Sequence, residues 1–148
     1  EVGHNAEMVR LLGLENREPF GDYHGQEIGF AGRFEEPLDM PGLIGRVVRV
    51  LGRPPIRVLD YGPDKIERVG CVSGGAASLV DQVTDARLDA YITGETSHTS
   101  FHQAVERELN VLFGGHYATE TLGLRALARH VEEAFDLETV FLDVPTGM

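Results

Sequence analysis

The second half of this 148-residue chain alternates short apolar segments with longer helix-like segments, and this alternation constrains the fold more than any other feature. Strands that alternate with helices are typical of parallel β-α-β units. We therefore predict an α/β fold with a mostly parallel sheet flanked by helices. Strands are expected at residues 66–72, 88–93, 110–113 and 139–144, and helices at residues 76–85, 97–109 and 119–135.

The first half of the chain carries weaker signals. Gly13 stands where a first helix should stop, and Pro41 stands where a second should open. The alternating Ile28 and Phe30 predict a strand. The expected elements are a helix at 5–13, a polar turn, a strand at 24–34, a helix at 42–51 and an edge strand at 56–59.

Charge and hydropathy exclude several classes of protein. The chain has 13 basic and 24 acidic side chains, a net charge of −11. Non-specific nucleic-acid binding and polybasic membrane binding both depend on Lys and Arg, so neither is expected. No segment approaches the roughly 18 apolar residues of a membrane span, and the amino terminus shows no export signal. With Cys71 as its single cysteine, the protein is expected to be reduced and cytoplasmic.

Polar residues follow three successive predicted strands. The turns are Ser73-Gly74-Gly75, Gly94-Glu95 and Gly114-Gly115-His116. In open parallel sheets, ligands bind at the carboxyl ends of the strands, so these turns are the candidate site. Their glycines let the backbone approach a ligand closely, or they simply form tight strand-to-helix turns.

His116 and Glu120 form the strongest candidate pair. His116 stands at the end of a predicted strand and Glu120 four positions later, in the first turn of the predicted helix, so both side chains can face one direction. An imidazole and a carboxylate that converge in this way are competent ligands for Zn, Mn or Fe. The alternative is that Glu120 only favours the helix N-terminus electrostatically, while His116 packs against the turn.

A second cluster follows the strand at 88–93. Glu95 lies in the turn, and His98 and His102 have the i,i+4 spacing of metal ligands on a helix, with Glu106 one turn further on. The alternative is a solvated helix face that holds two histidines. Because both clusters follow strands of the same predicted sheet, their coincidence favours a metal site.

These segments resemble a known family. The matching motifs are Tyr91-Ile92-Thr93-Gly94-Glu95, Phe101-His102-Gln103-Ala104, Gly114-Gly115-His116-Tyr117-Ala118-Thr119-Glu120, Gly123-Leu124-Arg125-Ala126-Leu127 and Phe141-Leu142-Asp143-Val144-Pro145, with Glu1-Val2-Gly3-His4-Asn5-Ala6 and Leu11-Leu12-Gly13-Leu14 at the start. Together they resemble the Nif-three-like, YbgI-type family of dinuclear metal-centre proteins, usually called GTP cyclohydrolase I type 2 homologues. The resemblance implies a three-layer Nif-three-like fold.

The resemblance also implies roles for individual residues. His116 and Glu120 match residues that bind a pair of divalent cations in the family, with the glutamate bridging them. Glu95 and His102 match residues that line the same cavity, either behind the metal ligands or as an acid or base. His98 matches a variable position and takes no role.

One part of the family pattern is missing from residues 1–148. Family members take further metal ligands from an amino-terminal half, with a His-His-Pro motif and an aspartate that this sequence lacks. The resemblance therefore implies that these residues are the carboxyl-terminal portion of one Nif-three-like domain. It also implies a toroidal homohexamer and a metal-dependent hydrolase that acts on a nucleotide or similar small molecule. The alternative function is a non-catalytic, metal-binding regulatory or protein-interaction module.

Overall fold

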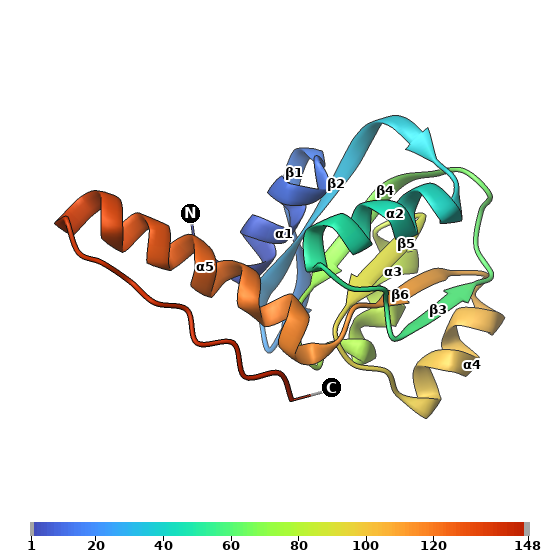
Figure 1. Ribbon diagram of the computed structural model, residues 1–148. Helices are drawn as coiled ribbons and strands as arrows, with labels where there is room; N and C mark the ends of the chain where they lie inside the picture. Colours follow the sequence, from blue (N-terminus) through green and yellow to red (C-terminus); the bar gives the residue numbers. More distant parts are fainter. Residues whose placement is uncertain (1, 147–148) are drawn as a thin grey trace.

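The computed structural model describes residues 2–146, which form a six-stranded sheet with helices on both faces (Figure 1). The strands are β1 (Glu15–Tyr23), β2 (Gln26–Leu38), β3 (Arg57–Asp60), β4 (Ile66–Val72), β5 (Ala90–Thr93) and β6 (Asn110–Phe113). They lie in the order β1-β2-β4-β5-β6-β3. The three central strands β4, β5 and β6 pair in parallel, whereas β1, β2 and β3 pair antiparallel to their neighbours. The predicted α/β fold is confirmed, with parallel pairing confined to the half of the chain that alternates.

The helices form one layer on each face of the sheet. They are α1 (His4–Leu12), α2 (Met40–Leu51), α3 (Val80–Asp85) preceded by a short 3-10 helix η1 (Ala77–Leu79), α4 (His98–Glu106) and α5 (His116–Phe135). Helices α1, α2 and α5 share an apolar cluster on one face, and α3 and α4 share a second cluster on the other. The central strands contribute side chains to both clusters, because successive side chains of a strand point to opposite faces of the sheet. Tyr91 and Ile92 of β5, for example, belong to different clusters.

Cys71 lies in the interior of β4, opposite Phe30 of β2. Its side chain is fully buried, and this burial raises the pKa of the thiol. The residue therefore behaves as a small apolar core residue, as its place in an apolar strand indicates. Within residues 2–146, no helix combines the length and the apolar character needed to cross a membrane.

Two sequence predictions are wrong. The polar turn expected after Gly13 is strand β1, in which only Phe20 and Gly21 are buried, so it carries almost no apolar pattern. The strand expected at residues 139–144 is not formed: this segment has no strand partner in the described part of the chain, and it runs back along α5 (Figure 1). The side chains of Val140, Leu142 and Val144 in this segment remain 70–78% exposed.

Candidate metal centre

Helix α5 begins after the two glycines that follow β6, three residues earlier than the sequence pattern predicts. This start makes His116 the first helical residue and puts Glu120 one turn further on, on the same side of the helix. The Nε2 atom of His116 lies 3.1 Å from Oε2 of Glu120. The junction between β6 and α5 therefore brings together the two residues predicted as metal ligands.

Glu95 approaches the same imidazole from the neighbouring strand. One residue, Gly94, separates Glu95 from the end of β5, and Oε1 of Glu95 lies 2.5 Å from Nδ1 of His116. The ring of His116 thus lies between two carboxylates. Its pKa is raised, first by the hydrogen bond to Glu95. Burial, the second-largest effect, opposes this rise, and the charges of Glu120 and Glu95 add to it.

Two glycines allow the strand ends to meet at this point. At Gly74, φ is +70°, and a β-carbon there would collide with Oε1 of Glu120. At Gly94, a β-carbon would lie 2.6 Å from the carbonyl oxygen of Gly74 and 2.9 Å from Oγ1 of Thr119. Both turns are therefore too close to other groups to accommodate a side chain, so the glycines shape the site as well as the turns.

Thr119 ties two of these turns together. It is fully buried, its hydroxyl donates to the carbonyl oxygen of Gly115 at 2.9 Å, and it accepts from the backbone N–H of Gly74 at 3.1 Å. This residue holds the turn after β4 against the first turn of α5, next to Glu120. The sequence reasoning missed it, because a threonine in a helix gives no signal of its own.

A pocket of about 490 Å³ opens over these residues. Glu95, His116 and Glu120 form its polar end, and His4 also lines it. The remaining wall is mostly apolar and comes from α5 and the segment that follows it: Tyr117, Thr121, Leu124, Phe141, Leu142, Val144 and Thr146. The site is thus a polar corner within a largely apolar pocket.

The segment after α5 is attached to the helix by side-chain contacts. The hydroxyl of Tyr117 donates to Asp143 at 2.7 Å and accepts from the backbone N–H of Val144 at 2.8 Å. The guanidinium of Arg125 lies 4.0 Å from the ring centre of Phe141. These contacts place the segment along one side of the pocket.

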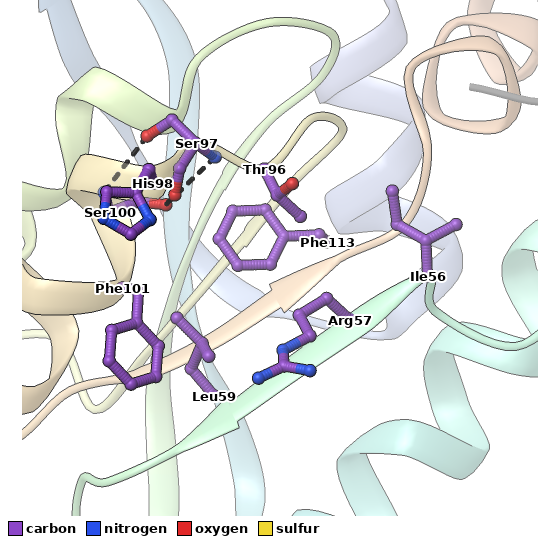
Figure 2. A pocket seen from close by; sticks show the side chains of 9 residues that line it. All are labelled: Ile56, Arg57, Leu59, Thr96, Ser97, His98, Ser100, Phe101 and Phe113. Carbon is purple, nitrogen blue, oxygen red and sulfur yellow. Dashed lines mark hydrogen bonds between the residues drawn. The ribbon is translucent and has the colours of Figure 1, made fainter.

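The structure does not bring His102 to this pocket. Its ring lies on an exposed face of α4, with ring centres 5.2 Å from His98 and 5.4 Å from Phe101. His98 lines a separate pocket of about 500 Å³, together with Arg57 of β3 and the buried Phe113. Figure 2 shows His98 and Arg57 in the walls of that second pocket.

The residues at the polar corner suit a divalent cation as part of a ligand set. An imidazole nitrogen and a carboxylate are a donor pair that Zn, Mn and Fe accept. Within residues 2–146, no group of three or more His, Cys, Asp or Glu side chains is placed to hold a metal ion. His116 and Glu120 are thus two candidate ligands, fewer than the three or four of a typical metal site.

The comparison with known proteins agrees with this arrangement. The model of the Duf34/NIF3 (NGG1p interacting factor 3) family matches residues 1–147. The chain belongs to this family. A GTP cyclohydrolase 1 type 2 homolog from Pyrococcus abyssi is 40% identical to it over the whole chain, which corresponds to 59% of that relative. The chain thus spans about three-fifths of the curated relatives it matches.

Two solved structures show the same fold. One is the protein ybgI, with a TM-score of 0.86 and 34% identity over 99% of this chain and 57% of that one. The other is TTHA1606 from Thermus thermophilus, with a TM-score of 0.85 and 37% identity over all of this chain and 57% of that one. The Nif-three-like fold implied by the motifs is therefore confirmed.

Proposed function

We propose that the chain belongs to a divalent-metal-binding protein with a dinuclear centre, in which His116 and Glu120 would hold the cations, with Glu120 as a ligand to both. The observation that carries this proposal is the imidazole of His116, which faces Glu120 with one nitrogen and Glu95 with the other. A metal-bound histidine usually donates its other ring N–H to an acceptor such as a carboxylate, which orients the imidazole. The cations are Zn, Mn or Fe.

Glu95 orients His116. When Nδ1 of His116 donates its proton to Glu95, Nε2 keeps its lone pair and points it toward Glu120. The carboxylate also makes the imidazole a stronger donor to a metal. Glu95 is thus a positioning residue, and His102, on the outer face of α4, has no part in this geometry.

The rest of the ligand set comes from outside residues 1–148. Two protein ligands are fewer than the three or four of typical sites, and the chain covers 59% of its Pyrococcus abyssi relative. We assign the missing ligands to an amino-terminal part of the same domain. We also propose that the complete protein forms a toroidal homohexamer.

The activity that this site supports is metal-dependent hydrolysis of a nucleotide or similar small molecule. Divalent cations supply a more acidic water and polarise the bond to be broken. The residues of this chain hold the cations at the polar corner, while the apolar wall of the pocket accommodates the body of the molecule. Turnover of GTP and other nucleotides by the metal-loaded, full-length protein, with loss of turnover in Glu120→Gln, would support this activity.

The alternative is a metal-binding module that recognises a partner protein. It is favoured by the exposure of Leu142 and Val144, which form part of the pocket wall. No turnover in the nucleotide screen, together with tight binding of a partner protein in a separate binding assay, would support this alternative over the hydrolase.

Metal content tests the ligand assignment. We expect full-length protein to bind divalent metal, and His116→Ala and Glu120→Ala to lose most of it. His130→Ala and Glu133→Ala on the exposed end of α5 are matched controls and should retain it. Glu95→Ala should lower metal affinity about tenfold to a hundredfold, whereas Glu106→Ala should not. Unchanged metal content in both ligand variants would overturn the assignment.

A further inference from the structure

His4 lines the same pocket as His116 and Glu120, although it lies at the opposite end of the chain. It is the first residue of α1, which packs against α5. Its sequence context gives it no partner, and its hydrogen bond runs to the backbone of α5 and not to the proposed metal ligands. A half-buried imidazole in a pocket with two carboxylates is a candidate for ligand recognition.

One hydrogen bond fixes the chemical form of this imidazole. The backbone N–H of Gly123 in α5 donates to Nδ1 of His4 at 3.2 Å. An imidazole nitrogen that accepts a hydrogen bond carries no proton, so the proton of the ring is on Nε2. His4 therefore offers an N–H group, and no lone pair, from its other nitrogen.

The close approach of α1 to α5 maintains this arrangement. A β-carbon on Gly123 would lie 2.7 Å from both the backbone nitrogen and Nδ1 of His4, and 2.9 Å from the carbonyl oxygen of Val2. Two of these three atoms are backbone atoms, which cannot move aside as the end of a side chain can. The contact therefore sets both the position and the orientation of the ring.

The two histidines of the pocket use Nδ1 in different ways. When Nδ1 of His116 donates to Glu95, its Nε2 can bind a cation. Gly123 donates to Nδ1 of His4, which leaves a proton on its Nε2. His116 can therefore bind a cation, whereas His4 can donate a hydrogen bond to a ligand of that cation.

We propose that His4 is a positioning residue whose Nε2–H donates to a phosphoryl or carbonyl oxygen of the ligand held at His116 and Glu120. The inference rests on the proposed metal site and adds a residue that contacts the ligand and not the cations. The polar end otherwise consists of two carboxylates and the imidazole of His116, so the N–H donor of His4 favours a ligand with an oxygen acceptor. A ligand without such an oxygen would leave this N–H unpaired inside the pocket.

Inorganic phosphate is the probe for this contact, because all of its oxygen atoms accept hydrogen bonds. Full-length, zinc-loaded protein is titrated with phosphate by calorimetry, as wild type, His4→Ala and His4→Gln, with His130→Ala as the control. Loss of one hydrogen bond to a charged acceptor should weaken phosphate binding by about tenfold in His4→Ala. His4→Gln replaces the Nε2–H with an amide N–H, so it should retain most of the affinity. Zinc content should stay at the wild-type level in both variants.

Three results would overturn the inference. The first is loss of zinc from His4→Ala, which would make His4 a metal ligand. The second is equal phosphate affinity in wild type and His4→Ala, and the third is a zinc-loaded wild type that does not bind phosphate. A crystal structure of the phosphate complex should place Nε2 of His4 within hydrogen-bond distance of an oxygen. Failure of the metal site itself would appear separately, as zinc retained in His116→Ala and Glu120→Ala.

Discussion

The two ends of α5 belong to one helix but are held in different ways. The first half carries the proposed metal ligands and buries five residues against the sheet and α1: Ala118, Thr119, Leu122, Gly123 and Ala126. No residue from 127 to 135 is buried, and this half projects beyond the sheet (Figure 1). The helix is therefore packed tightly around the proposed ligands, and few contacts hold its second half.

This difference has a structural cause. The first turn of α5 is reached by turns from two other strands, through Gly74, Gly94 and Thr119. The second half is attached mainly by side chains, such as Arg129 to Glu7 at 2.9 Å and Glu132 to Thr139 at 2.6 Å. Substitutions should therefore cost most near the first turn and least near the far end.

The largest effect is expected from Gly94→Ala. The added methyl would contact the carbonyl oxygen of Gly74 and the hydroxyl of Thr119, so the turn must move. We expect a loss of about 3 kcal/mol in the free energy of unfolding, measured by denaturant titration. Gly45→Ala in α2 is the matched control, because nothing lies within 4 Å of its added methyl. That change should be neutral or stabilising, and equal effects at the two sites would contradict the comparison.

A smaller effect is expected from Thr119→Val. The substitution keeps the shape of the side chain but removes the acceptor of the Gly74 N–H, which would stay buried without a partner. We expect a loss of about 2 kcal/mol in the free energy of unfolding, and a lower metal affinity because Glu120 is adjacent. In Thr121→Val, only a hydroxyl that donates to Ala118 of the same helix is lost, so little should change. A Thr119 variant as stable as the Thr121 variant would show that the turns do not depend on this hydroxyl.

The pH dependence of the metal-free protein should show a still smaller effect. The pKa of His116 is raised in the folded state, first by its hydrogen bond to Glu95. This contribution to stability is therefore fully present below the unfolded pKa and is lost as pH rises through the folded pKa. Because the side chain is 37% exposed, the contribution should be about 1 kcal/mol or less. Thermal unfolding in the presence of a chelator should show that the stability advantage of wild type over His116→Asn shrinks from pH 6 to pH 9. A stability advantage that grows with pH would show that the pKa of His116 is lowered on folding.

The smallest effect is expected from Leu142→Ser, beyond the far end of α5. Leu142 is 78% exposed, so the exchange should alter the free energy of unfolding of residues 1–148 by less than about 0.5 kcal/mol. Denaturant titration of the Leu142→Ser and Gly94→Ala variants side by side would compare the effects at the two ends of α5. A loss of several kcal/mol from Leu142→Ser would show that the segment is more firmly held than its exposure indicates.

The centre of the fold could be predicted because its signals are local. Residues 66–72, 88–93 and 110–113 are largely apolar segments, each followed by a glycine-bearing turn, and each contains a central strand. Strand β1 lies at the edge of the sheet and buries only two of its nine residues, so no apolar alternation marks it. The segment 139–144 shows the apolar alternation of a strand. A strand also needs a hydrogen-bonded partner, and the spacing of apolar residues does not indicate whether one is present.

The site was predictable to the extent that sequence spacing determines it. His116 and Glu120 follow from helical spacing, and Glu95 follows from the rule that parallel strands end at one edge of the sheet. His102 has the same helical spacing from His98, but α4 turns this face outward. His4 and Thr119 reach the site through contacts between distant segments, for which a single sequence carries no signal.

The burial of Cys71 has a practical consequence for studying this site. Its thiol is fully buried near the end of β4, and its raised pKa keeps it protonated, so maleimides and other alkylating reagents should not modify it in the folded protein. It is the single cysteine among residues 1–148. A cysteine introduced at an exposed position such as Leu142 would therefore be the reactive thiol of this chain. A spin label or fluorophore attached there could report on the pocket wall without prior removal of the native cysteine.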